Sequence, residues 1–293
     1  MTEAPTGAEN SSPSSPLSYD RAVKARVPPS QHFEHNGRRI AWREYGAGPR
    51  VVLLLHGLLM DGRMFQKLGP ELAGRGYRVL TVDMLGHGDS APVRDMTAHS
   101  MTLYGQDVIA LLDHLGIPQA VVGGTSLGAN VSLEVAVAAP DRVRALVIEM
   151  PVLENGLVGA GTLFIPLGLA IRVNRRGMQL LARVTRFIPR TLFLADLLID
   201  FVRRDPETSL AILDGITFGR VAPPASERRR LKHRALVVGH ARDPIHPFSD
   251  ADMLAHELPD ARLVEATSIL EWRMTPSRLD RELVDFLAQV WAS

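Results

Sequence analysis

The chain of 293 residues is long enough for one large α/β domain, or for such a domain with an insertion. Its formal net charge of +1 gives no electrostatic reason to expect nucleic acid as a partner. It contains no cysteine, which excludes disulfides, thiolate metal sites and a cysteine nucleophile.

The composition of the first 28 residues predicts a disordered tail, and we expect a cytoplasmic protein. Residues 1–28 are rich in Ser, Pro, Glu and Ala, which predicts a disordered segment, and they lack the apolar core of a signal peptide. The longest apolar run, residues 157–171, is shorter than the roughly 20 residues that span a bilayer. We therefore expect no stable membrane insertion.

Strands and helices alternate along most of the chain. Asn36-Gly37 lies between two strand-like runs, which predicts a hairpin, and the apolar residues 51–55 are typical of a strand buried on both faces. Further strands are predicted at 78–82, 120–122, 144–148, 235–238 and 262–264. Helices are predicted at 64–75, 102–115, 129–138, 248–257 and 276–291. This pattern predicts an α/β fold, with a mostly parallel sheet between two layers of helices.

One interval interrupts the alternation. Residues 153–230 carry apolar residues at helical spacing, and five prolines divide them into short helices. We predict a helical cap at 153–230, inserted into a core made of 29–152 and 231–293. The interval is rich in arginine: Arg172, Arg175, Arg176, Arg183, Arg186 and Arg190. These arginines favour a solvated face, with an anionic substrate or a membrane surface as alternatives.

The most informative motif is Gly124-Thr125-Ser126-Leu127-Gly128, a G-x-S-x-G pentapeptide between a predicted strand and a predicted helix. In that context the motif predicts a nucleophile elbow, in which a sharp turn raises the serine hydroxyl above the sheet edge. An ordinary glycine-rich turn is the alternative. Asp243 follows the strand at 235–238 and is a candidate acid, although Asp-Pro also starts turns. Glu149, at the end of the preceding strand, is a second candidate.

Four motifs together resemble the α/β-hydrolase fold superfamily. They are His56-Gly57-Leu58, the D-x-x-G-x-G-x-S pattern at 83–90, the elbow at Ser126, and residues 239–247. The resemblance implies that the backbone N–H groups of Leu58 and Leu127 form an oxyanion hole. It also implies structural roles for His56 and His87, and an acid role for Asp243.

The usual catalytic histidine is missing. Members with a full triad carry it in the loop before the last helix, where this chain has Ile269. His246 is the first candidate to replace it, although it is only three residues from Asp243 and could be a simple turn residue. His240 ends a strand, His256 is expected to be solvated, and Glu271 is a weak base unless burial raises its pKa.

The sequence therefore predicts a serine-type hydrolase of a small, largely apolar carboxylic ester or related acyl compound. Its site would contain Ser126, Asp243 and His246 as an atypical triad, with Leu58 and Leu127 at the oxyanion hole. We predict a small-molecule substrate, no cofactor, no bound metal and no nucleic-acid partner. The alternative is a non-hydrolytic relative, either a lyase or isomerase or a ligand-binding protein without a working triad.

Overall fold

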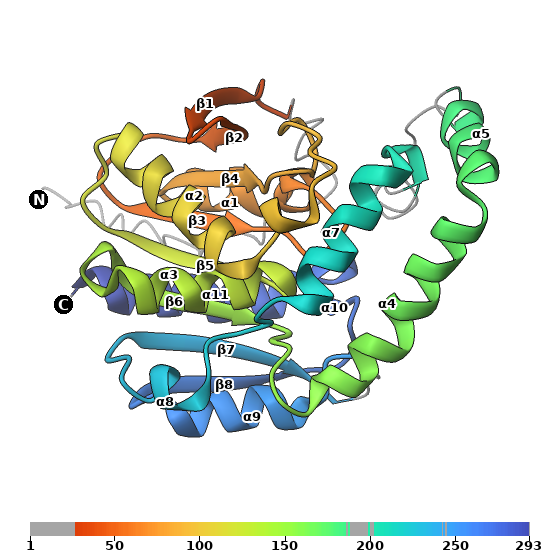
Figure 1. The fold of residues 1–293 in the computed structure, drawn as a ribbon. Coiled ribbons are helices and arrows are strands. Elements are labelled where there is room, and N and C mark those ends of the chain that lie inside the picture. Colours follow the sequence, from red (N-terminus) through yellow and green to blue (C-terminus); the bar gives the residue numbers. More distant parts are fainter. Residues whose placement is uncertain are drawn as a thin grey trace, which may run out of the picture.

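A mixed β-sheet runs through the centre of the molecule (Figure 1). The computed structural model describes residues 27–185, 187, 199, 202–241, 243 and 245–292. The eight strands are β1 Gln31–His35, β2 Arg38–Tyr45, β3 Val51–Leu55, β4 Arg78–Asp83, β5 Ala120–Thr125, β6 Val143–Glu149, β7 Arg234–His240 and β8 Asp260–Ala266. Their order in the sheet is β1-β2-β4-β3-β5-β6-β7-β8, and every pair from β4 to β8 is parallel, while β2 is antiparallel to both its neighbours.

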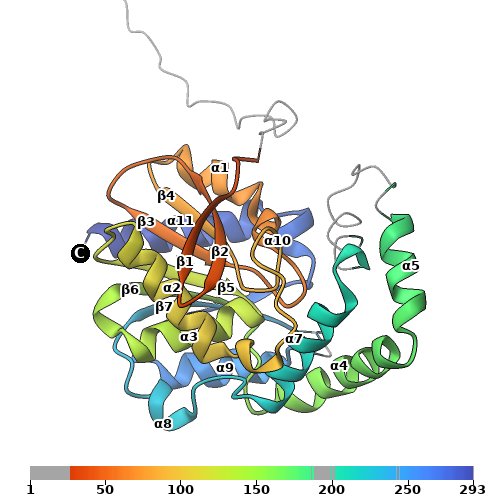
Figure 2. The ribbon, with the colours of Figure 1, turned by 45° about the horizontal axis from the view of Figure 1, so that its top comes forward.

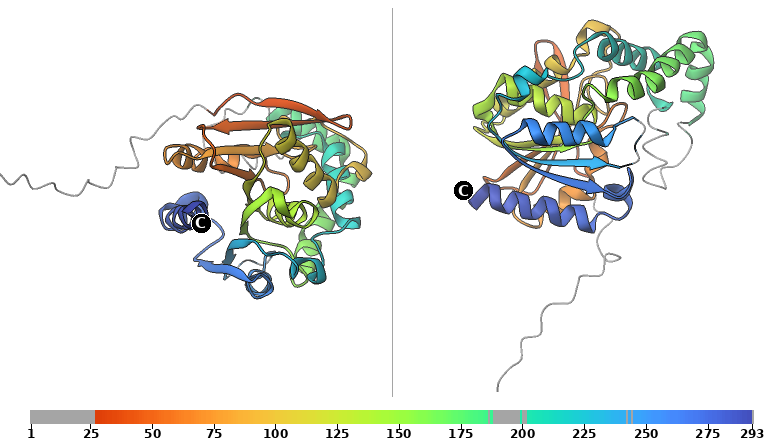
Figure 3. Two further views of the ribbon diagram at one scale, coloured as in Figure 1. Left: turned by 90° about the vertical axis from the view of Figure 1, so that its left-hand side faces the viewer. Right: turned by 90° about the horizontal axis from the view of Figure 1, so that it is seen from below.

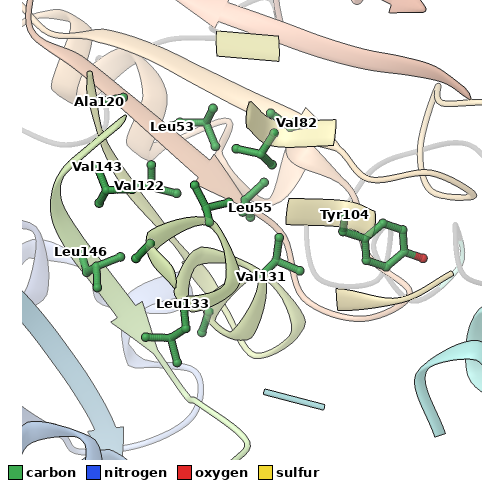
Figure 4. Packing of buried hydrophobic residues seen from close by; sticks show 14 of the residues in the cluster. Leu53, Leu55, Val82, Tyr104, Ala120, Val122, Val131, Leu133, Val143 and Leu146 are labelled. Atoms are coloured by element: carbon green, nitrogen blue, oxygen red, sulfur yellow. The ribbon is translucent and has the colours of Figure 1, made fainter. Parts of the chain in front are cut away.

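The central strands are buried on both faces, as their continuous apolar sequences predict. In β3, Leu53 and Leu55 pack with one hydrophobic cluster, whereas Val52 and Leu54 pack with the cluster on the opposite face. Side chains alternate in this way because successive residues of a strand point to opposite faces. Figure 4 shows Leu53 and Leu55 near residues of the helix that follows β5.

Helices cover both faces of the sheet. Those packed in the first cluster are α2 Met101–His114, α3 Leu127–Ala138 and α9 Phe248–Glu257. Those on the opposite face are α1 Leu68–Ala73, α10 Glu271–Met274 and α11 Ser277–Ala292. Figure 3 shows α9 and α11 on opposite sides of the sheet. The predicted α/β architecture is therefore confirmed, and the parallel strands place their carboxyl ends along one edge.

The helix predicted at 64–75 is divided in the structure. A 3₁₀ turn at Gly62–Phe65, capped by the Asp61 carboxylate, precedes the shorter α1. The physical reason is Pro70, which has no N–H to donate to the carbonyl of Gln66 and would interrupt a continuous helix. Its place in the first turn of α1 is one where no such hydrogen bond is required.

The interval between β6 and β7 contains the helices α4 Gly156–Val173, α5 Arg175–Thr185, α7 Pro206–Phe218 and α8 Ala225–Arg228. α4 and α5 extend along one side of the molecule (Figures 1 and 2). By length and composition, α4 could cross a membrane. Residues 1–26, which make up most of the predicted tail, lie outside the described residues, and so do Arg186 and Arg190.

Two buried charged groups attach this helical interval to the core. Asp250 of α9 is fully buried, and its carboxylate accepts the backbone N–H groups of Leu153, Asn155 and Gly156 at 2.7, 3.0 and 2.8 Å. These N–H groups lie at the start of α4, where the helix dipole favours a negative charge. Arg228 of α8, also buried, donates to Glu257 of α9 at 2.6 Å.

A half-buried carboxyl on α11, that of Asp280, makes stability depend on pH. Asp280 accepts a hydrogen bond from the Trp272 indole N–H at 2.9 Å. Burial raises the pKa of Asp280 to about 6, and the neighbouring Glu71 adds to this effect. Between about pH 4 and 6 the folded state therefore holds a proton that the unfolded state has released, so this group lowers stability as the pH rises.

Asp280→Asn is expected to stabilise the protein by about 2 kcal/mol at pH 8, because it removes a half-buried charge and its amide oxygen can still accept the indole N–H. Below about pH 4, where Asp280 is neutral in both states, the two proteins should have nearly equal stability. Urea unfolding at several pH values measures the difference. A gain that is independent of pH would contradict this explanation.

Candidate active site

Ser126 lies on a strained turn between β5 and α3. Its φ of 54° and ψ of −110° are unusual for a residue other than glycine. Glycine is required on both sides: a Cβ atom at Gly124 would lie 2.5 Å from the Leu55 carbonyl oxygen, and one at Gly128 would lie 2.1 Å from the same atom. The chain therefore has the strand, sharp turn and helix that a nucleophile elbow needs.

His246 is in contact with both Ser126 and Asp243. Its Nδ1 lies 2.7 Å from Asp243 Oδ2, and its Nε2 lies 2.9 Å from Ser126 Oγ. An ionised carboxylate can only accept hydrogen bonds, so Nδ1 carries the proton and Nε2 accepts the Ser126 hydroxyl. This tautomer is the one in which an imidazole can remove the serine proton.

Asp243 is held by the turn that carries His246. Its Oδ1 accepts the backbone N–H groups of Ile245 and His246 at 2.8 and 3.0 Å, which leaves Oδ2 for the imidazole. Burial alone would raise the pKa of Asp243, but the hydrogen bonds and charge of His246 and these two N–H groups together lower it. Asp243 is therefore ionised at neutral pH, and the three-residue tether permits the contact.

The other candidate bases have different partners. His240 Nδ1 donates to the Ser268 carbonyl at 2.8 Å, and His256 is exposed on α9. Glu271 binds Arg278 and the Thr267 N–H, and these interactions, the Arg278 hydrogen bond foremost, lower its pKa to about 2. A carboxyl with that pKa is a poor base at neutral pH. Ile269, at the family's usual histidine position, is partly exposed.

Glu149, the second candidate acid, belongs to a buried network beneath the elbow. Its Oε2 accepts from Thr125 Oγ1 at 2.5 Å and from the Arg273 guanidinium at 2.6 Å. Burial opposes its ionisation, but the charge of Arg273, together with His240 and Thr125, lowers the pKa of Glu149 to about 2. His240 Nε2 lies 3.7 Å from Oε1, and the Glu149 backbone carbonyl accepts the Ser126 N–H at 2.8 Å.

Sequence reasoning did not identify Arg273 as part of this network. The only available signal was Glu149 itself, because a carboxylate at the end of a buried strand requires a cationic partner. The partner could not be chosen from the sequence, since Arg273 is 124 residues away and lies on the short helix α10.

Leu58 and Leu127 line the same cavity as Ser126. Leu127 is the first residue of α3, so its N–H has no acceptor within the helix. Among the described residues, neither the Leu58 N–H nor the Leu127 N–H donates a hydrogen bond to a backbone carbonyl. Two further non-glycine residues with positive φ flank this region, Leu59 at 62° and Met150 at 56°. Such strain is concentrated at functional sites in proteins.

His56 and His87 support the loops below the site. His56 Nε2 accepts the Met84 N–H at 3.0 Å, and its Nδ1 donates to the Gly57 carbonyl at 2.8 Å. His87 Nδ1 donates to the Leu85 carbonyl at 3.0 Å. Burial lowers the pKa of both rings, so they are neutral; His56 joins the loops that follow β3 and β4 by its hydrogen bonds, and the His87 ring packs against it with the ring centroids 4.8 Å apart.

An apolar cavity of about 260 Å³ opens above Ser126. α4 supplies one wall through Leu157, Ala160 and Phe164, and α7 supplies another through Ile216. The Asn130 side chain donates to the carbonyls of Val152, before α4, and Val221, between α7 and α8, which ties α3 to the helical interval between β6 and β7. Within the described ranges, no cluster of three or more His, Cys, Asp or Glu residues could hold a metal ion.

Comparison with known proteins identifies the fold. A model of the alpha/beta hydrolase fold matches residues 50–175. Bifunctional epoxide hydrolase 2 of Mus musculus is 36% identical over 110 residues, which are 38% of this chain and 20% of that protein. Zearalenone hydrolase of Bionectria ochroleuca is 36% identical over 122 residues, 40% of this chain and 45% of that protein. The matches thus span less than half of these relatives' own length.

The likeness to solved structures extends over most of the chain. The enol-lactonase from Burkholderia xenovorans LB400 superposes with a TM-score of 0.72 at 22% identity, covering 88% of this chain and 100% of that one. Est816, described as an N-acyl homoserine lactone degrading enzyme, gives 0.69 at 23% identity, covering 87% of this chain and 100% of its own. At such identities the likeness concerns the fold alone.

Proposed function

Because the chain belongs to the α/β-hydrolase fold superfamily, we propose that it is a serine hydrolase of small, largely apolar carboxylic esters, lactones included. The observation that carries the proposal is the unbroken chain of hydrogen bonds from Asp243 through His246 to Ser126. Nucleophile, base and orienting acid within hydrogen-bond reach are the arrangement that acyl transfer requires.

In this mechanism His246 Nε2 removes the Ser126 hydroxyl proton as Oγ attacks the ester carbonyl carbon. The negative charge that develops on the carbonyl oxygen is stabilised by the N–H groups of Leu58 and Leu127, each worth about 3 kcal/mol in such sites. The imidazolium then protonates the departing alkoxide, which leaves an acyl group on Ser126. Water, deprotonated by His246, hydrolyses that intermediate, and Asp243 stabilises the imidazolium in both halves.

The cavity supports the substrate class. Its walls are mostly apolar side chains from α4 and α7, with Ser126, Asn130 and Thr217 as the polar residues of the lining, which suits a largely apolar acyl group. The names of two solved relatives refer to lactone substrates, and an intramolecular ester reacts by the same steps. In this proposal residues 153–230 form the cap that selects the substrate, and the enzyme acts in the cytoplasm without a cofactor.

The direct test is labelling with a fluorophosphonate, which phosphonylates an activated serine and releases fluoride. We expect one adduct by intact mass, located on Ser126 by peptide mapping, and no adduct in Ser126→Ala. An unlabelled protein with a folded circular dichroism spectrum would overturn the hydrolase proposal and favour the non-hydrolytic alternative.

A further inference from the structure

The helix α4 is apolar on both sides but mostly exposed. Of its 18 residues, only Gly156, Gly168 and Ile171 are buried. Its inner side lines the cavity and packs on α7 through Phe164 and Leu167. A helix that is hydrophobic all round is normally found in a protein core or in contact with lipid.

α5 follows α4 along the side of the molecule (Figure 2), and both helices carry exposed apolar side chains. The side chains of Val158 and Val173 are 78% and 80% exposed. The α4–α5 face consists of these exposed residues: Val158, Leu169, Val173, Leu180 and Val184. Exposed apolar side chains gathered on neighbouring helices mark interaction sites on soluble proteins more often than single ones do.

The charge of this region is entirely positive. Between residues 156 and 185 the chain has four arginines and no acidic residue, although its net charge overall is only +1. Arg172 and Arg175 pair with Asp214 and Glu207 of α7, whereas no ion pair among the described residues involves Arg176 or Arg183. Exposed apolar side chains with arginines beside them are typical of helices that lie in a lipid–water interface.

We propose that the α4–α5 face binds the surface of an anionic phospholipid bilayer. Apolar side chains would enter the acyl boundary, while Arg176 and Arg183 meet lipid phosphates. A symmetric dimer through this face is less suitable, because it would place the arginines of one copy against those of the other without an acidic partner.

The sheet topology and the lengths of the described helices argue that α4 lies on the bilayer and does not cross it. β6 precedes α4 and β7 follows it, and the two strands pair directly in one sheet. A single crossing would separate them, and a return crossing would need about 20 residues. α5 has 11 residues and α7 has 13, so neither described helix is long enough.

Surface binding would place the cavity above Ser126 next to the acyl chains, because α4 forms both the cavity wall and the docking face. That consequence rests on the proposed function, but the binding itself does not. Ser126→Ala should therefore bind vesicles as the wild type does, whether or not the protein is a hydrolase.

The test is cosedimentation of the full chain with vesicles of phosphatidylcholine, with or without phosphatidylglycerol. We expect at least about tenfold stronger partitioning onto the anionic vesicles, weakening as salt is added. Val158→Glu/Val173→Glu should lower this partitioning about tenfold or more, whereas Val158→Leu/Val173→Leu should retain it. Arg176→Glu/Arg183→Glu should remove the preference for phosphatidylglycerol, and each single reversal should weaken it, whereas the single reversal Arg281→Glu on α11 should not.

Each contrary result overturns the proposal. Wild-type protein that stays in the supernatant with both vesicles excludes a lipid surface. Binding that survives Val158→Glu/Val173→Glu places the contact elsewhere. A dimer in analytical ultracentrifugation that this double variant dissociates, without vesicle binding, assigns the face to a second copy. Circular dichroism and thermal unfolding of every variant exclude loss of the fold as the cause.

Discussion

His246→Ala is expected to lower kcat/KM for a soluble p-nitrophenyl ester by about 10⁴-fold, nearly as much as Ser126→Ala. Without the imidazole, the Ser126 hydroxyl keeps its proton and is a weak nucleophile at neutral pH. The double variant should be no worse than either single variant, because residues that act as one unit are not additive in their effects. Steady-state kinetics on the three variants measures this.

Ile269→His provides the complementary control. In the wild-type background it should give little gain, because the Ser126 hydroxyl already donates to His246. In the His246→Ala background, any recovery would show that the loop before α11 can supply a base from the family's usual position. If His246→Ala alone retains its turnover, His246 is a turn residue and the proposed triad is wrong.

Arg273→Met is expected to destabilise the fold by about 3 kcal/mol at neutral pH. It leaves the Glu149 carboxylate, whose side chain is only 3% exposed, without its cationic partner. In the wild type the lowered pKa of Glu149 contributes stability above about pH 4.5, which is lost as the pH falls toward 2. In the variant, burial dominates and raises this pKa, so the deficit should shrink in acid, where the carboxyl is neutral.

A second substitution separates charge from packing. Arg273→Met/Glu149→Gln should recover much of the lost stability, since it removes the unpaired charge and keeps a group that Thr125 can hydrogen-bond. As a matched control, Arg75→Met breaks an exposed pair with Glu71 and should cost less than about 1 kcal/mol. Chemical unfolding curves measure all three. Equal losses in the Arg273 and Arg75 variants would show that the buried network contributes little.

The regular elements followed from local patterns in the sequence. The apolar run at 51–55 and the alternation of strands and helices were sufficient for the parallel sheet, because each strand's burial is encoded in its own residues. The division of the helix predicted at 64–75 was missed, because the apolar spacing outweighed the signal of Pro70. The turn at Ser126 was also local, since Gly124 and Gly128 are required where no Cβ atom fits.

Contacts between distant residues were decided only by the tertiary structure. The sequence ranked His246 first among several candidate bases but could not determine whether its ring reaches Ser126, 120 residues away. Nor could it pair Glu149 with Arg273, or distinguish the buried side of α4 from its exposed side, since both are apolar. The spacing of apolar residues indicates which residues share a face of one helix or strand. The contacts named above depend on how separate helices and strands pack, and that packing is formed only when the sheet assembles.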